Sequence, residues 1–265
     1  MSRIYSKATN DEADKLAQEI LDYMETLSGK ENWKELVLQK IDNMRREHEE
    51  HKESVKKVYE EHPWDFSEER KRPIFISDGS LDICPVRLED KPFYCRIRRF
   101  WMRENGMKKM AEILDDDAIW KQIWLDRTFC CIVKLDGNPI GYVMLQDTRE
   151  SIWEIVAEFD PEYCNKGYGS KSMLLFLKAV QEITMKDLYR AKVEVENIAS
   201  QKCLAKLGAE LVGITNGAIE DEDEKTRFEN ENLDRIDANM VSLAELLGVE
   251  PRKLLSHVLE YHIYL

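Results

Sequence analysis

The chain has 265 residues, of which 43% are hydrophobic and 34% charged, and its formal net charge is −13. This apolar content suffices for a packed core and excludes a chain that is disordered throughout. The strong negative charge disfavours general binding to nucleic acid, because phosphates are repelled. It favours cationic partners such as amines.

Compartment and metal content can also be predicted. No apolar run approaches the roughly 18 residues of a membrane span, and no apolar stretch follows the positive charges of residues 1–7, as a secretory signal would require. The six cysteines form no Cys-x-x-Cys pair, and the five histidines lie far from them in the sequence. We therefore expect a cytoplasmic protein with reduced thiols, no membrane contact and no metal site.

Residues 1–78 are predicted to form an N-terminal helical hairpin, or arm. Apolar residues recur at helical spacing over 13–27, and Gly29 ends this first helix. A second helix is predicted over 31–61, with a short heptad seam and with Pro63 after its end. The arm has three interpretations: a dimerisation arm that gives a homodimer, a partner-binding arm, or an antiparallel pair lying on the main domain.

Residues 79–265 are predicted to form a mixed α/β domain, because strand and helix patterns alternate there. Asp90-Lys91-Pro92 offers a cap and a first-turn proline for a helix, and 136–139 read as a hairpin turn. Strands are expected over 81–88, 130–133, 140–145, 152–159, 191–196, 210–214 and 258–265. Further helices are expected over 118–125, 169–183 and 199–207.

An acidic, helical insertion is predicted over 217–254, before the last strand. The five consecutive acids of 220–224 must be solvated. One long helix is expected over 226–247, closed by Gly248, and Pro251 opens a short helix after it.

Residues 92–129 combine aromatic and basic side chains, and each of these two groups has two interpretations. The aromatics could line a pocket for a bound molecule or fill the core, and the arginines could hold an anionic group of that molecule or balance nearby acids. The residues concerned are Phe93, Tyr94, Phe100, Trp101, Trp120, Trp124, Arg96, Arg98, Arg99 and Arg103.

The segment from Cys164 to Ser170 lies between a predicted strand and a predicted helix and holds Gly167 and Gly169. Glycines permit unusual dihedral angles, and successive amides at a helix start form an anion cradle suited to a phosphate. A P-loop is excluded, since no Gly-Lys-Ser/Thr follows, and a Rossmann fingerprint needs a third glycine. An ordinary tight turn is the alternative.

A second motif lies about thirty residues downstream: strand, Asn197-Ile-Ala-Ser200, a helix, and Lys206-Leu-Gly208. Together the two motifs resemble the GNAT superfamily of N-acetyltransferases, whose members show Gln/Arg-x-x-Gly-x-Gly/Ala, then Asn-x-x-Ala/Ser, then Lys-x-Gly-Phe. The sequence from Asn197 to Gly208 is most similar to the branch of ribosomal-protein and antibiotic acetyltransferases. Cys164 replaces the family's first Gln/Arg, either as a reactive thiol or as a tolerated substitution, and Ala209 replaces its Phe.

The resemblance implies an α/β (α+β) fold, with a mixed, mostly antiparallel twisted sheet flanked by helices. It implies acetyl-CoA as co-substrate, with the pyrophosphate on the loop amides and the pantetheine arm beside the strand at 157–159. The cofactor-binding residues it predicts are Ala157, Phe159, Asn165, Lys166, Gly167, Tyr168, Gly169, Ser170, Asn197 and Ser200.

The implied reaction is attack by a primary amine of a small molecule or peptide on the thioester. An alkyl amine with a pKa near 10.4 needs about 4–5 kcal/mol to lose its proton at pH 7, so a carboxylate base is expected. Glu154 is the predicted base, and Glu158, on the same strand face, is a second catalytic candidate. Leu204 occupies the position of the family's usual acid, a tyrosine; Ser200, water, Tyr142 or Tyr261 could replace it. The alternative function is a non-catalytic acyl-CoA-binding module with a partner-binding arm.

Overall fold

The computed structural model describes residues 64–265 except Asp126, Ala218 and Glu220, together with Leu36, Gln39, Lys40 and Asn43. The predicted N-terminal hairpin lies almost wholly outside the described residues, so the arm and its three interpretations stay predictions. Within the described part of the chain, every helix is too short or too polar to cross a membrane.

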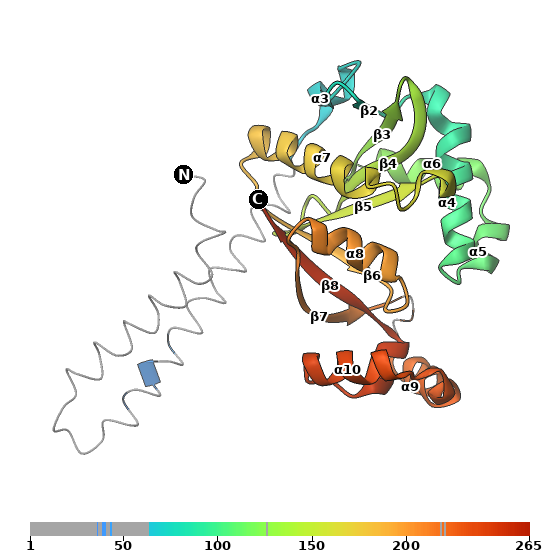
Figure 1. Ribbon diagram of the computed structural model, residues 1–265, viewed down its shortest axis with the longest axis vertical. Coiled ribbons are helices and arrows are strands. Elements are labelled where there is room, and N and C mark those ends of the chain that lie inside the picture. Colours follow the sequence, from blue (N-terminus) through green and yellow to red (C-terminus); the bar gives the residue numbers. More distant parts are fainter. Residues whose placement is uncertain are drawn as a thin grey trace.

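The described residues form an eight-stranded sheet in the order β1-β2-β3-β4-β5-β6-β8-β7 (Figure 1). Within this sheet every neighbouring pair is antiparallel except β5 and β6, which run parallel. The strands are β1 (Ile76–Ser77), β2 (Leu81–Pro85), β3 (Phe129–Leu135), β4 (Asn138–Gln146), β5 (Trp153–Phe159), β6 (Leu188–Val193), β7 (Glu210–Asn216) and β8 (His257–Tyr264). The predicted mixed, mostly antiparallel sheet is confirmed.

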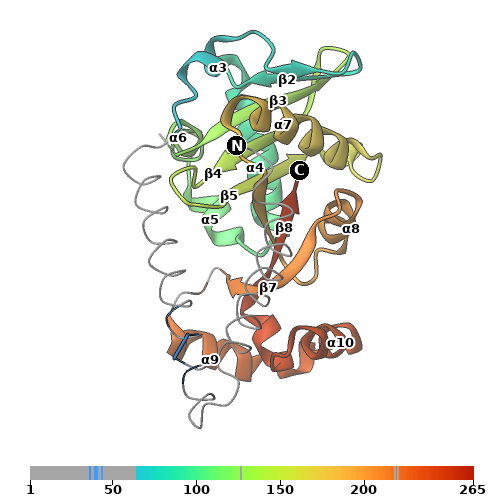
Figure 2. The same cartoon turned by 90° about the vertical axis from the view of Figure 1, so that its left-hand side faces the viewer.

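Helices cover both faces of the sheet, as the two views in Figures 1 and 2 show. The α-helices are α3 (Ser67–Lys71), α4 (Lys91–Glu104), α5 (Lys108–Ile113), α6 (Asp116–Lys121), α7 (Tyr168–Thr184), α8 (Ile198–Lys206), α9 (Glu222–Glu231) and α10 (Ala238–Leu247). Single turns of 3₁₀ helix are η1 (Leu88–Asp90), η2 (Gln122–Trp124), η3 (Pro161–Tyr163), η4 (Leu233–Arg235) and η5 (Pro251–Leu255).

Two hydrophobic cores, one on each face of the sheet, follow from the two-residue period of its strands. On β3, Phe129 and Cys131 pack into the core that contains Phe176 of α7. Their neighbours Cys130 and Ile132 point the opposite way, into the core beneath α4–α6. A strand buried on both faces reads as an unbroken apolar run, which is why the sequence predicted it so readily.

Residues 66–78, which the prediction assigns to the arm, pack against the sheet that begins with β1 and β2. Phe66 is 3% exposed and stacks on Phe129 with ring centroids 4.4 Å apart. Phe75 packs edge-on against the same ring, and β1 pairs with β2. Residues from 66 onward therefore belong to the packed domain, a fact that their sparse apolar pattern concealed.

The insertion between β7 and β8 contains two α-helices, so the prediction of one helix over 226–247 is wrong. Asn232 ends α9 by donating its side-chain amide to the carbonyl of Phe228. Asp237 then caps α10 by accepting a hydrogen bond from the amide of Met240 at 2.8 Å. These caps interrupt the helix although the apolar stripe continues. Gly248 ends α10 in the left-handed conformation, as predicted.

The predicted bounds of two further elements differ from those in the structure. The helix predicted to begin at residue 226 begins within the acidic run, since Asp221 caps α9 and Glu222 to Glu224 occupy its first turn. Negative charge there is favourable, because the helix dipole is positive at its N-terminus. Strand β6 ends at Val193 rather than at the predicted 196, and the amide of Asn197 closes a turn on the carbonyl of Glu194.

Gly141 on β4 allows β5 to approach closely, and this makes a testable prediction. A Cβ at Gly141 would lie 2.5 Å from Cδ1 of Phe159 and 2.7 Å from the carbonyl oxygen of Glu158. We expect Gly141→Ala to lower the free energy of unfolding by about 1–3 kcal/mol, the usual cost of overpacking. Gly213→Ala on β7 is the matched control, since its Cβ would meet nothing within 4 Å. Urea denaturation measures both, and equal losses would contradict the prediction.

Candidate active site

A cleft opens where the parallel strands β5 and β6 separate. Their registered pairs are Trp153 with Tyr189 and Glu154 with Arg190, and beyond these the strands diverge. The cleft has a volume of about 570 Å³ and is bounded by β5, β6, the start of α7, and α8. The open edge of β5 there presents backbone groups without a strand partner, as a peptide-like ligand requires. The two strands thus open a V-shaped gap, which we call the main cleft.

The start of α7 faces the main cleft with unsatisfied amides. Gly167 is its N-cap, in the left-handed conformation with φ +86°, and a Cβ there would meet nothing within 4 Å. The first intrahelical bond runs from the amide of Lys171 to the carbonyl of Gly167. The amides of Tyr168, Gly169 and Ser170 therefore have no helical acceptor, and glycine has no side chain to cap them. This arrangement fits the diphosphate of an acyl carrier.

Most of the predicted cofactor-binding residues lie together in this cleft. Lys166 and Tyr168 are absent from its lining, although their amides belong to the same loop. The predicted residues that do line it are Ala157, Phe159, Asn165, Gly167, Gly169, Ser170, Asn197 and Ser200. Asn197 also caps α8, since its side-chain oxygen accepts a hydrogen bond from the amide of Ser200 at 3.0 Å.

Glu158 is the carboxylate that lines the main cleft. Its Oε1 accepts a hydrogen bond from Arg98 on α4 at 2.5 Å, and its Oε2 accepts one from the hydroxyl of Tyr142, the residue opposite it on β4. Burial raises the pKa of the Glu158 carboxyl, and the charge of Arg98 and the bond from Tyr142 offset part of that rise. The site thus holds a carboxylate that is both shielded from water and fixed in position.

Glu154, the predicted base, lies at the closed end of the gap, where β5 and β6 are still paired. It is 7% exposed, forms an ion pair with Lys192 at 2.9 Å and accepts a hydrogen bond from Gln146 at 3.0 Å. It is not among the residues that line the main cleft. The alternation that placed both glutamates on one face was right, but sequence spacing does not show where two strands separate.

Three arginines of α4 form ion pairs with acids, which favours charge balance over the binding of an external anion. Besides the pair between Arg98 and Glu158, Arg96 pairs with Asp160 at 2.8 Å and Arg99 with Asp116 at 2.6 Å. These contacts fasten α4 to the end of β5 and to α6.

The aromatic residues of this region divide between the two interpretations. Tyr94 and Trp120 are buried in the core beneath α4–α6. Trp101 lines the main cleft and donates its indole N–H to the carbonyl of Phe159 at 2.7 Å. Helical periodicity alone could not separate these roles.

Cys164 has the environment of an unreactive thiol. It precedes α7 by several residues, and burial raises its pKa, which favours the neutral form. The tolerated loop substitution is therefore the better interpretation. Leu204, at the position of the family's usual tyrosine, is 2% exposed. Ser200, one of the alternatives, lines the main cleft, whereas Tyr142 is fully buried beside Glu158.

A second cavity of about 340 Å³, the side pocket, continues the main cleft. The two share Asn105, Lys192, Val193, Asn197 and Ser200. The side pocket extends beyond them to Glu194, Asn216, Gly217 and Val258. Sequence reasoning missed this wall, because Asn216 and Gly217 carry no motif. A search of the described residues for three clustered metal-ligating side chains finds no such group.

The structure is similar to solved structures that include RimL and RimJ. RimL, a ribosomal L7/L12 alpha-N-protein acetyltransferase in complex with coenzyme A, is 11% identical with a TM-score of 0.50, over 72% of this chain and 98% of that one. Mycobacterium smegmatis RimJ in complex with CoA-disulfide is 16% identical with a TM-score of 0.47, over 69% of this chain and 81% of that one. The likeness to RimL shows that the splayed mixed sheet is the GNAT fold.

Residues 81–210 also match the family model described as an acetyltransferase (GNAT) domain. Residues 81–210 therefore form a GNAT acetyltransferase domain, as the two sequence motifs predicted. No curated protein matches the sequence.

Proposed function

We propose that the protein is an acetyl-CoA-dependent N-acetyltransferase that acetylates a primary amine of a small molecule or peptide. The observation that carries the proposal is the main cleft itself. It joins unsatisfied amides at the start of α7, an open strand edge on β5 and the buried carboxylate of Glu158. Coenzyme A in the RimL structure supports the same ligand class for this fold.

The chain's own groups suit each part of that co-substrate. Amides of the loop and first turn of α7, at residues 165–170, would hold the diphosphate. The edge of β5 at 157–159 would pair with the amide groups of the pantetheine arm. Asn197 has its oxygen engaged by the amide of Ser200, so its side-chain NH₂ is the group left to donate to that arm. When bound, acetyl-CoA supplies the thioester whose carbonyl carbon the amine attacks.

Of the two predicted carboxylates, Glu158 is the better proton acceptor. It lines the cleft, whereas Glu154 is engaged by Lys192 outside the lining. Each carboxylate oxygen carries two acceptor sites, so the bonds from Arg98 and Tyr142 leave capacity for a proton, directly or through a water. We assign Glu158 the role of base and Arg98 that of positioning it. Ser200 is the cleft-lining hydroxyl that can supply a proton to the departing thiolate.

The proposal is tested by measuring turnover with a panel of primary amines. We expect coenzyme A release to be matched by an N-acetylated product, identified by mass, with at least one amine. The acetyl-CoA concentration must saturate a site whose affinity is first measured by calorimetry. Binding of acetyl-CoA without acetylation of any amine would contradict the proposal and favour the non-catalytic acyl-CoA-binding module, with which Leu204 is consistent.

A further inference from the structure

The side pocket is the continuation of the main cleft, which gives an acceptor a place beside the reacting centre. Its far wall comes from the end of β7, at Asn216 and Gly217. That wall is tightly fitted, because a Cβ at Gly217 would lie 2.9 Å from the carbonyl oxygen of Ser256. The inference below rests on the proposed function, in which an amine acceptor must reach the cleft.

The side-chain amide of Asn216 has a fixed orientation, set by chemistry. The ammonium of Lys225 lies 2.8 Å from its Oδ1. An ammonium can only donate, so the atom facing it must be the oxygen. Among the described residues, none accepts a hydrogen bond from the remaining NH₂ of Asn216, which therefore faces its surroundings as a donor only. Asn197 is oriented in the same way, since its oxygen accepts from the amide of Ser200.

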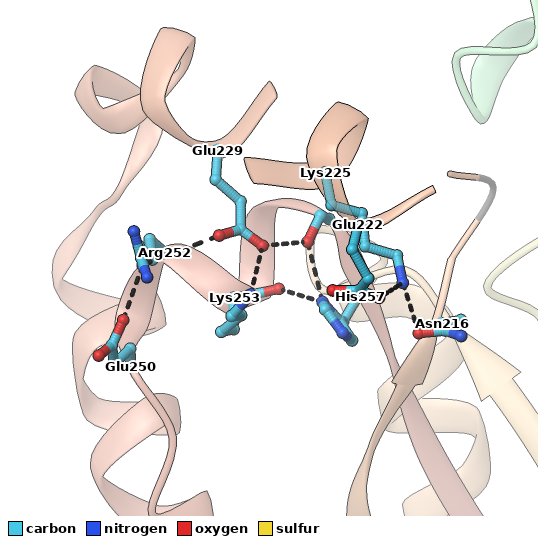
Figure 3. A network of polar contacts seen from close by, with 9 residues as sticks. Asn216, Glu222, Lys225, Glu229, Glu250, Arg252, Lys253 and His257 are labelled. Atoms are coloured by element: carbon cyan, nitrogen blue, oxygen red, sulfur yellow. Dashed lines mark hydrogen bonds and ion pairs between the residues drawn. The ribbon is translucent and has the colours of Figure 1, made fainter. Parts of the chain in front are cut away.

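Lys225 belongs to α9 of the insertion and is fully buried. Figure 3 shows its side chain beside Asn216 and Glu222. Its ammonium also donates to Glu222 at 2.6 Å, one turn earlier on the same helix. A buried ammonium without partners is costly, so Lys225 and Asn216 hold each other in place. The insertion between β7 and β8 therefore contacts the wall of the side pocket through the hydrogen bond from Lys225 to Asn216, whereas the ion pair with Glu222 stays within α9.

The charge of the side pocket complements the amide donor of Asn216. Two charged residues line it, and Lys192 is neutralised by its ion pair with Glu154 at 2.9 Å. Glu194 is the remaining charge and suits a cationic ammonium. The pocket thus offers a negative group to an amine and the amide donor of Asn216 to an oxygen, while the donor of Asn197 serves the pantetheine arm.

We propose that Asn216, positioned by Lys225, is a specificity-determining residue that donates a hydrogen bond to a carbonyl oxygen of the acceptor. The substrate class is then a primary amine that also carries a carbonyl oxygen, rather than a simple alkylamine or polyamine.

The test compares two amines that differ by one carboxamide, phenylalaninamide and phenethylamine. In Asn216→Ala we expect kcat/KM for phenylalaninamide to fall about three- to tenfold, the worth of one hydrogen bond, and that for phenethylamine to change less than twofold. Lys225→Met should shift the same ratio in the same direction. The ratio between variants cancels the different amine pKa values, as in a double-mutant cycle.

The exposed Asn230, on the same helix as Lys225, provides the control variant Asn230→Ala, which should leave both rates unchanged. Asn216 is itself exposed, so we expect Asn216→Ala to fold. Its rates test the proposal even if Lys225→Met does not fold. An equal effect on both amines, or no effect on either, overturns the inference, as does acetylation confined to amines without a carbonyl. Absence of acetylation for every amine, with acetyl-CoA bound, overturns the proposed function instead.

Discussion

Replacing Glu158 with glutamine is expected to lower kcat by about 10²–10⁴-fold, the usual contribution of a positioned general base. Glutamine keeps the size of the side chain and can still accept a hydrogen bond from Arg98 or Tyr142, but it cannot take a proton from the amine. The affinity for acetyl-CoA should change little, because the amides at the start of α7 are untouched. Steady-state kinetics and calorimetry measure the two quantities separately.

Glu154→Gln is the matched control, on the same strand and the same face. Because Glu154 is engaged by Lys192 and Gln146 outside the main cleft, we expect its loss to reduce kcat far less. A larger effect at Glu154 than at Glu158 would reverse the assignment and restore the prediction made from the sequence.

The pH dependence provides a second readout. Glu158 must be ionised to accept a proton, and burial raises its pKa above the usual 4.5. The wild-type rate should therefore rise with pH through that raised pKa, and Glu158→Gln should lack this step. The pH–rate profile is then measured with a second amine of lower pKa. A step caused by an enzyme group stays at the same pH, whereas a step caused by deprotonation of the amine moves to lower pH.

How much of this site the sequence predicts depends on how local each part is. The glycines at 167 and 169 and the cap at Asn197 act within a few residues of themselves, so their spacing already predicts a helix start and an anion cradle. The alternation of β5 likewise places Glu154 and Glu158 on one face. These are short-range properties, and the structure retains them.

The parts of the site that could not be predicted from the sequence depend on contacts between distant segments of the chain. Glu158 gains its importance from Arg98, sixty positions earlier, and from the point at which β5 and β6 separate. The buried Lys225 reads in the sequence as one more charge in a charged segment. Its partner Asn216 carries no motif, so only the fold reveals that the two form a wall of the side pocket.

Replacing Gly167 with valine is expected to weaken acetyl-CoA binding by about 10- to 100-fold. Gly167 has φ +86°, a conformation that costs a residue with a Cβ roughly 1–2 kcal/mol and a β-branched residue more. Relief of that strain turns the loop and moves the amides that follow it. Each hydrogen bond to a charged group is worth about 1.5–3 kcal/mol, so the loss of one accounts for the expected change in Kd.

Strain alone could also weaken binding by destabilising the protein, and Gly248→Val separates the two effects. Gly248 likewise adopts a left-handed conformation, with φ +65°, at the end of α10, and a Cβ there would also meet nothing within 4 Å. We expect both variants to lose comparable stability in thermal denaturation, whereas only Gly167→Val loses affinity for acetyl-CoA in calorimetry. Equal affinity in the two variants would mean that the amides at the start of α7 do not hold the diphosphate, and the main cleft would then need a different ligand.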